Sequence, residues 1–400
     1  MATMRHATIQ ETKENLHTKG LIKPQGTTHT ATQRPALTGL SINTQATAPA
    51  LKDISKKCDI TAKAKDVKEV QLVQKQSKLD HKPLQPRKEE GKQQPQLRLQ
   101  SRSQVPAPSQ EKSDITKIED PDKSTIQDPL QVTEYLKDIF AHLRDLETKY
   151  AIREDFLDHH RTTPNMRSVL VNWLVEIHAD FEQKPETLYL CVSIVDRYLQ
   201  TNTLVGRSSL QLVGTAALLI ASKYEEMYLP SLSDFEYICD GAFTSKQIIQ
   251  MEIDILKRLE FNLGYPPAIQ FLKRYSKVIR AKAEHYTMSK YFLELALLEH
   301  TLSSVKPSLL AAAACCLAKG VIDEIMELPK IWTPAMVHYT TYQYQDFRRP
   351  MIQLAGIVAK VDTSSFTQVK KKYSAAAYLK ISNNENLNGP LIRKLASTKK

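Results

Sequence analysis

The side chains of this sequence that could do chemistry are its cysteines and histidines, and their spacing fits neither a metal centre nor a redox pair. The five cysteines are Cys58, Cys191, Cys239, Cys315 and Cys316. None of them forms a C-x-x-C pair, which zinc ribbons and thiol–disulfide motifs require. The one adjacent histidine pair, His159 and His160, lies in a linker-like stretch and is expected to meet solvent rather than a metal. We therefore expect no metal and no cofactor.

The motifs of the common enzyme classes are also missing from the sequence. It has no Gly-rich phosphate loop, no H-R-D or D-F-G of a protein kinase and no serine nucleophile elbow. The last four cysteines lie in apolar stretches and are predicted to be small core residues. The sequence therefore favours a non-catalytic protein.

Composition divides the chain into a tail and a folded part. No aromatic residue precedes Tyr135, and residues 1–100 hold 18 Lys and Arg against 9 Asp and Glu, so most of the net charge of +11 lies there. Such a stretch cannot bury enough apolar area to offset an ordering entropy of roughly 1–2 kcal/mol per residue. We predict a disordered basic tail over residues 1–125. Its lysines lack aromatic partners for base stacking, so we expect it to serve solubility or nuclear import, not nucleic-acid binding.

The sequence carries no signal of secretion or of a membrane span. Its start has no apolar core of a signal peptide, and no apolar run approaches the roughly 20 residues that cross a bilayer. We expect an intracellular protein in the nucleus, without a membrane partner.

From about residue 131 onward the apolar residues recur with helical spacing. Glycine is scarce and hairpin signals are nearly absent, which argues against a β architecture. After a leading helix at about 131–146, the pattern predicts two sets of five helices. The first set covers about 164–181, 186–200, 208–226, 231–239 and 245–260, and the second about 268–278, 285–301, 307–319, 333–341 and 345–361. The third helix of each set is rich in small residues, with Lys223 and Lys319 at matching places 96 residues apart. One irregular helical domain is the alternative.

Several long motifs in this region resemble the cyclin box. Met166-Arg-Ser-Val-Leu-Val-Asn-Trp-Leu-Val-Glu176 is similar to its first helix, and Leu212-Val-Gly-Thr-Ala-Ala-Leu-Leu-Ile-Ala-Ser-Lys-Tyr-Glu-Glu226 to its third. The details resemble mitotic B-type cyclins, and within them the third B-type subgroup through Leu210-Gln-Leu-Val-Gly and Phe271-Leu-Lys-Arg-Tyr.

The resemblance implies an all-α fold of two tandem cyclin boxes. Its predicted parts are the tail at 1–125, a helix and linker at 126–163, a first box at 164–263, a second box at 264–362 and a mobile C-terminal extension at 363–400.

The family's paired charges can be carried over to this sequence. Arg167 and Asp196 match the pair that ties the first two helices together, and Lys223 and Glu252 match the pair that meets the kinase. Without the resemblance, Lys223 and Glu252 would be interpreted as a solvated surface pair worth about 0–1 kcal/mol.

A second set of residues matches the shallow groove where cyclins dock arginine–leucine motifs of substrates and inhibitors. Its members are Met166, Val169, Leu170, Trp173, Glu176 and Gln211. The first four share one helical face, and by spacing alone they would be a core stripe. The resemblance implies that Glu176 meets the arginine. Asn172 and Val169 stand where the family usually has Asp and Ile.

Two short motifs in the tail resemble degradation signals read by the mitotic ubiquitin ligase. Lys13-Glu14-Asn15 is a KEN box, and Arg34-Pro-Ala-Leu37 resembles a destruction box whose terminal asparagine, Asn43, comes one position late.

Together these features predict a regulatory subunit that binds and activates a cyclin-dependent protein kinase in mitosis or meiosis and is then destroyed by ubiquitin-mediated proteolysis. The alternative is a DNA-binding transcription factor with two tandem cyclin folds. Such factors usually add a zinc ribbon, for which the tail has no cysteine pair, and carry basic repeats, whereas the folded part here is close to neutral overall.

Overall fold

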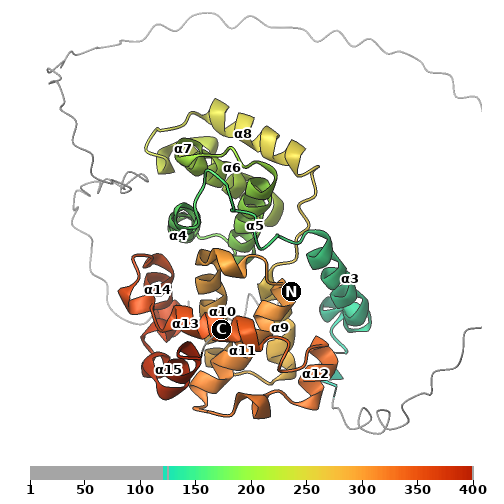
Figure 1. Ribbon diagram of the computed structural model, residues 1–400. Helices are drawn as coiled ribbons and strands as arrows, with labels where there is room; N and C mark the ends of the chain where they lie inside the picture. The colour runs from blue at the N-terminus through green and yellow to red at the C-terminus, as the bar shows by residue number, and fades with distance from the viewer. Residues whose placement is uncertain (1–119, 124–125, 399–400) are drawn as a thin grey trace, which may run out of the picture. The chain divides into compact units, whose positions relative to one another are not determined.

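The computed structural model describes residues 120–123 and 126–398, which belong to one compact unit. Every regular element among these residues is a helix (Figure 1). The all-α prediction is confirmed for this part of the chain, and the predicted disordered tail lies almost wholly outside it.

The helices follow the predicted plan of a leading helix, two sets of five and a C-terminal segment. The leading helix and first bundle are α3 (Leu136–Lys149), α4 (Pro164–Asp180), α5 (Pro185–Thr201), α6 (Arg207–Glu225), α7 (Leu232–Ile238) and α8 (Ser245–Arg258). The second bundle comprises α9 (Ala268–Val278), α10 (Ala283–Leu298), α11 (Pro307–Ile322), α12 (Pro334–Thr340) and α13 (Arg348–Val358). The C-terminal segment adds α14 (Gln368–Tyr373) and α15 (Pro390–Ala396).

Short 3₁₀ turns complete the chain. They are η3 (Pro129–Gln131), η4 (Thr133–Tyr135), η5 (His300–Leu302), η6 (Leu328–Ile331), η7 (Val361–Thr363), η8 (Ala376–Tyr378), η9 (Ile381–Asn383) and η10 (Glu385–Asn388). The bundle helices begin and end within three residues of their predicted bounds, whereas the leading helix starts at Leu136 because η3 and η4 occupy the residues before it.

Local sequence sets the starts of several helices. At α4, the Thr163 side chain accepts a hydrogen bond from the backbone N–H of Met166, and Pro164 occupies the first turn. Ser231 and Thr244 form capping boxes at α7 and α8. These caps satisfy backbone N–H groups that have no partner inside the helix.

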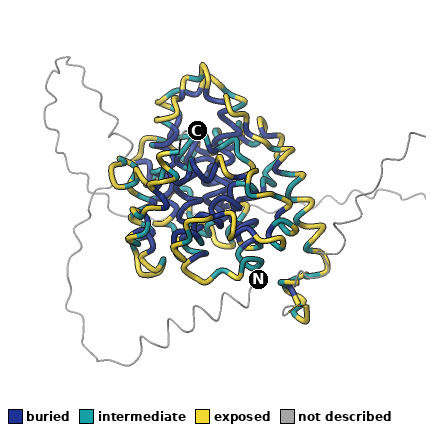
Figure 2. Tube along the Cα trace, turned by 60° about the horizontal axis from the view of Figure 1, so that its bottom comes forward, coloured by how far each residue is buried: buried dark blue, intermediate teal, exposed yellow. Residues whose placement is uncertain are grey.

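The third helix of each bundle is largely buried. Figure 2 shows that the buried segments gather in the middle of the described part of the chain. In α6, residues 213–222 are all buried, and a Cβ added at Gly214 would lie 2.7 Å from a methyl carbon of Leu170 on α4. In α11, Gly320 has the same role, because a Cβ there would meet the side chains of Leu328 in η6 and Leu391 in α15. Small residues therefore let neighbouring elements pack closely in both bundles.

The leading helix α3 is anchored on the second bundle (Figure 1). Arg144 donates from Nη2 to the backbone oxygens of Tyr339 and Thr340, at 3.2 and 3.1 Å. The buried carboxylate of Glu147 accepts hydrogen bonds from the backbone N–H and the hydroxyl of Ser308 at the start of α11. Burial raises the pKa of Glu147, and these two hydrogen bonds oppose that shift.

The tail boundary predicted at residue 125 is wrong by a few residues. Asp122 is buried against α9, where it forms ion pairs with Arg274 and, at 2.7 Å, with Lys277. These two cations lower the pKa of Asp122, although burial itself opposes the shift. The docked acidic side chain explains why residues 120–123 have a defined place.

The C-terminal extension predicted to be mobile is, over residues 363–398, packed against both bundles. Val369 and Tyr373 of α14 are fully buried, and Leu391 and Ile392 of α15 are buried as well. α14 contacts α4 and α10, and α15 contacts α13. The prediction failed because each helix is too short to show a periodic apolar pattern.

A buried ion pair fastens α14 to α10. Glu294 is 1% exposed, and both its carboxylate oxygens accept hydrogen bonds from Lys372 Nζ, at 2.9 and 2.8 Å. The Tyr373 hydroxyl donates to the same carboxylate at 2.7 Å. These hydrogen-bond partners of Glu294 come from the C-terminal segment, and Lys290 on α10 adds an electrostatic attraction without a direct ion pair.

We predict that Lys372→Met destabilises the protein by about 3–5 kcal/mol, because it leaves the buried Glu294 carboxylate without its cation. Adding Glu294→Gln should restore part of this loss, since the amide carries no charge. The midpoint of urea unfolding measures both effects. Lys371→Met, at the exposed neighbouring position, is the control and should stay within about 0.5 kcal/mol. A midpoint for Lys372→Met equal to that of the control would contradict the assignment.

Candidate functional site

Lys223 and Glu252 meet at the surface of the first bundle. Lys223 Nζ donates to Glu252 Oε1 at 2.6 Å, and the two side chains are 47% and 10% exposed. Lys223 is in the last turn of the core helix α6, and Glu252 lies on α8 between the buried Ile248 and Ile255. Both elements are thus held by packing, so the pair presents a charged donor and acceptor in a fixed orientation.

Large apolar side chains stand exposed on the same two helices and directly after them. They are Tyr224, Met227, Tyr228, Leu229, Ile249, Ile253 and Phe261. Met227 and Tyr228 are 82% and 87% exposed. Single exposed apolar residues are common, but a group of them marks an interaction surface. We call these seven residues, with Lys223 and Glu252, the α6–α8 surface.

The apolar part of the α6–α8 surface was not predicted from the sequence. The run Met227-Tyr228-Leu229 lies between Glu226, which caps the end of α6, and Pro230, so its position outside the helix was the available signal. On α8, Ile248 and Ile255 point into the core, whereas Ile249 and Ile253 lie outside that buried face and are exposed.

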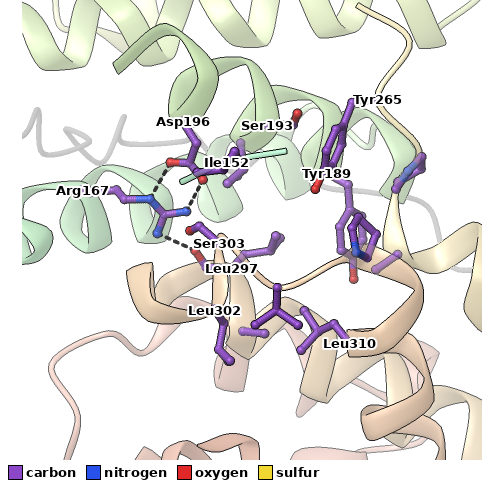
Figure 3. A pocket seen from close by; sticks show the side chains of 16 residues that line it. Ile152, Arg167, Tyr189, Ser193, Asp196, Tyr265, Leu297, Leu302, Ser303 and Leu310 are labelled. Carbon is purple, nitrogen blue, oxygen red and sulfur yellow. Dashed lines mark hydrogen bonds and ion pairs between the residues drawn. The ribbon is translucent and has the colours of Figure 1, made fainter. Parts of the chain in front are cut away.

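Arg167 and Asp196 form a fully buried ion pair between α4 and α5. Arg167 Nε and Nη2 donate to the two carboxylate oxygens of Asp196 at 2.5 and 2.6 Å, which is a bidentate geometry. The third donor, Nη1, reaches the backbone oxygen of Leu297 on α10 at 2.9 Å (Figure 3). The pair therefore connects the first two helices, as the resemblance implied, and also ties the first bundle to the second.

A cavity of about 60 Å³ adjoins this pair and is lined by residues of both bundles (Figure 3). Ligand pockets usually measure about 300–1,000 Å³, so this space is too small for a cofactor. Burial raises the pKa of Tyr189 and Tyr265 at its edge, which keeps both phenols protonated. The cavity is part of the seam between the bundles and no candidate for the functional site.

The six residues assigned to the docking groove divide into an accessible and a buried set. Met166, Val169 and Glu176 are partly exposed along α4. Leu170, Trp173 and Gln211 are 0%, 6% and 8% exposed. The expectation of an exposed groove is therefore wrong for Leu170, Trp173 and Gln211, and the core stripe that spacing alone indicated describes Leu170 and Trp173. Gly214 lets Leu170 pack directly on α6. Leu170 and Trp173 lie beneath the accessible residues of α4.

The cysteines, and His160 of the adjacent histidine pair, are held within the fold. Cys191, Cys239, Cys315 and Cys316 are free and buried, which confirms their prediction as core residues. His160 is not simply solvated, because its Nδ1 accepts the backbone N–H of Thr162 and its Nε2 contacts the backbone oxygen of Asn202. Within residues 120–123 and 126–398 no group of three or more His, Cys, Asp or Glu side chains could hold a metal ion.

Some predicted features lie outside the described residues. These are Cys58, Lys13, Glu14, Asn15, Arg34 and Leu37. Among the helices that the structure does describe, none is long and apolar enough to cross a membrane.

Comparison with known proteins identifies both bundles. Residues 138–264 match the family model "Cyclin, N-terminal domain", and residues 266–387 match "Cyclin, C-terminal domain". Among solved structures, a viral cyclin from herpesvirus saimiri aligns with a TM-score of 0.46 at 20% identity, covering 55% of this chain and 97% of that one.

The curated relatives are mitotic cyclins. The chain is 41% identical over 283 residues to the G2/mitotic-specific cyclin-B of Spisula solidissima, covering 71% of this chain and 65% of that protein. It is 42% identical over 285 residues to the G2/mitotic-specific cyclin-B2 of Bos taurus, covering 71% and 70%. With the cyclin-B2 of Oryzias javanicus it shares 43% over 281 residues, covering 70% and 72%. The chain therefore belongs to the B-type cyclin family.

Proposed function

We propose that this B-type cyclin is the regulatory subunit of a cyclin-dependent serine/threonine protein kinase, which it binds and activates, and that it has no catalytic activity of its own. The observation that carries the proposal is the α6–α8 surface, where an ion pair held by two packed helices lies on the same elements as a group of exposed apolar side chains. Burying such side chains against a partner favours association, and the net gain is what remains after the lost rigid-body freedom and the ordering of side chains are offset. Lys223 and Glu252 would fix the register of the partner helix.

The mechanism is a shift of the kinase between two arrangements. The cyclin binds the arrangement in which the regulatory helix of the kinase lies inward, so that the glutamate of that helix pairs with the lysine that binds ATP. A partner can shift such an equilibrium only by its differential affinity for the two states. No covalent step on the cyclin is needed.

Charge distribution speaks against the DNA-binding alternative for the first bundle. Residues 126–265 hold 13 Lys and Arg against 21 Asp and Glu, whereas residues 266–398 hold 18 against 9. The folded part is balanced only as a whole, because an acidic first bundle offsets a basic second one. A protein that grips DNA with both folds would need positive charge on both.

We further propose that arginine–leucine segments of substrates or inhibitors dock on α4. Met166 and Val169 would contact the leucine, with Leu170 and Trp173 as the buried base, and the carboxylate of Glu176 would receive the arginine. The proposal keeps five of the six residues that the family resemblance implied. Leu170 and Trp173, however, support the docking face from below instead of contacting the ligand.

The tail proposals rest on sequence motifs. Lys13-Glu14-Asn15 and Arg34 with Leu37 would be bound by the mitotic ubiquitin ligase, and the surplus of lysines in residues 1–100 supports import into the nucleus. Assignment to the third B-type subgroup likewise rests on Leu210-Gln-Leu-Val-Gly and Phe271-Leu-Lys-Arg-Tyr.

The double variant Lys223→Ala with Glu252→Ala should lose kinase binding while keeping the fold. Removing charged partners from a desolvated interface costs about 2–5 kcal/mol. Co-purification with the kinase followed by a histone-kinase assay measures the effect. The matched control is Lys330→Ala with Glu327→Ala, an ion pair whose side chains are 76% and 66% exposed. Equal kinase recovery with the two double variants would rule the proposed contact out.

Met166→Ala with Glu176→Gln should raise KM for substrates that carry an arginine–leucine motif by about tenfold, because a charged hydrogen bond worth about 1.5–3 kcal/mol is lost. Activity toward a short peptide without the motif should not change. Glu182→Gln, an exposed acidic residue just beyond α4, is the control. Trp173→Ala is unsuitable here, since loss of a buried tryptophan costs about 3–5 kcal/mol of stability. An equal loss of activity toward both substrates would contradict docking on α4.

Deleting residues 1–50 should give a cyclin that still activates its kinase but persists past anaphase. Half-lives after release from metaphase should be compared for the intact protein, for Lys13-Glu14-Asn15 changed to alanine and for Arg34 with Leu37 changed to alanine. We expect the KEN-box variant to be stabilised at least as much as the other, because Asn43 is displaced in the destruction box. Identical half-lives for all three would show that neither motif acts as a degradation signal.

A further inference from the structure

A cleft of about 430 Å³ lies between α10, α13 and the end of α15. Large apolar side chains line it, among them Leu295, Leu298, Ile352 and Phe366. Its volume falls within the roughly 300–1,000 Å³ of ligand pockets. Ser168 is its one lining residue from the first bundle. The cleft therefore shares no residue with either surface proposed above.

The cleft is also lined by a glycine that the packing of the fold does not explain. Gly356 lies inside α13, where glycine destabilises a helix because it loses the most backbone freedom on folding. The other two glycines inside helices of the described part of the chain, Gly214 and Gly320, avoid a clash with a neighbouring side chain. A Cβ added at Gly356 would have nothing within 4 Å. The bare backbone there leaves space that a ligand group can approach closely.

Two cations flank Gly356 on the same side of α13. Arg349, Gln353, Gly356 and Lys360 follow one another at spacings of four, three and four residues, so they form one stripe. Arg349 and Lys360 are exposed, and neither forms an ion pair or side-chain hydrogen bond with any residue among 120–123 and 126–398. At 1.5 Å per residue they lie about 16 Å apart along the helix axis.

The charge around the cleft favours a negative ligand. The one acid among its lining residues is Glu299, whose Oε1 lies 3.2 Å from the His300 ring and accepts from the Thr301 hydroxyl at 3.3 Å. Residues 266–398 hold 18 Lys and Arg against 9 Asp and Glu. Residues 1–100 of the same chain carry an excess of positive charge, so they are a poor occupant.

We propose that this cleft binds a short acidic segment of a partner protein. A large apolar side chain of the segment would enter the cleft beside Gly356, and acidic residues on either side of it would reach Arg349 and Lys360. An extended chain rises about 3.3 Å per residue, so roughly five residues span the distance between the two cations. The site goes beyond kinase activation, because it would hold a partner on the second bundle while the α6–α8 surface holds the kinase.

Fluorescence anisotropy with the full-length cyclin tests the site with three labelled peptides. The first has phenylalanine at its centre and two acidic residues on each side. The second carries the corresponding amides in place of the acids, and the third has alanine in place of phenylalanine. We expect the first peptide to bind at least about fivefold more tightly than either of the others at low salt. Its advantage over the amide peptide should shrink as salt is raised, because exposed charges are screened.

Variants of the cyclin locate the binding. Gly356→Leu should weaken binding of the acidic peptide at least about fivefold, because leucine fills the cleft, while the urea midpoint of unfolding stays equal or rises. Gly356→Ala is the matched control, since it leaves most of the cleft open and should bind within about twofold of the intact cyclin. Arg349→Glu with Lys360→Glu should abolish the preference for the acidic peptide over the amide peptide. Lys371→Glu, at an exposed position on α14, should retain it.

Three results would overturn the proposal. They are equal binding of the acidic peptide by the intact cyclin and a folded Gly356→Leu, a loss of preference in Lys371→Glu as large as in the double charge variant, and no preference in the intact cyclin. If Gly356→Leu lowers the unfolding midpoint, the double charge variant decides alone. Kinase activation should be unchanged in every variant, so failure of this site leaves the proposed kinase function standing.

Discussion

The arrangement of the two bundles depends on one buried guanidinium group. Arg167 lies on α4 and is 1% exposed. Two of its nitrogens donate to the Asp196 carboxylate on α5, and a third donates to a backbone oxygen of α10, so this one side chain connects three helices. A buried guanidinium that loses its ion-pair partner destabilises the fold strongly. The three helices are therefore restricted to relative positions that keep these hydrogen bonds. The α6–α8 surface and the docking face on α4 both belong to the bundle that this group orients. Their geometry toward a partner therefore depends on this buried contact between the bundles.

In both bundles, small residues allow the central helix to pack closely against its neighbours. A helix surrounded by other helices must be apolar on nearly all sides, and close approach requires short side chains. Gly214 and the alanines of α6 meet this need in the first bundle, and Gly320 with Ala311–Ala314 of α11 meets it in the second. The consequence for function differs between them. In α6 the last turn carries Lys223 to the exposed surface, whereas in α11 the matching Lys319 pairs with Asp323 and stays within its own bundle.

The helices could be predicted from the sequence because long amphipathic segments and their caps are local properties. The pairing of Arg167 with Asp196 could be predicted only from the family resemblance, since nothing local relates residues 29 positions apart. Burial of Leu170 and Trp173 was predicted by helical spacing alone, and the expectation of an exposed groove came from the family resemblance. The C-terminal segment was missed because Val369 and Tyr373 are too few to suggest a core, and their burial exists only where α4 and α10 offer a surface. Tertiary contacts, not local propensity, decide the second case.

The pairing of Glu294 with Lys372 makes the second bundle sensitive to the integrity of the chain. During synthesis α10 leaves the ribosome about 80 residues before its cation does, so this carboxylate must stay hydrated until residue 372 arrives. A product shortened by a premature stop codon or by a protease before that residue keeps the acid and lacks its counter-ion. Such a fragment contains both boxes almost entirely, yet its core remains open at α10. Quality-control proteases cleave chains that are locally unfolded. Shortened molecules would therefore be degraded before they bind a kinase.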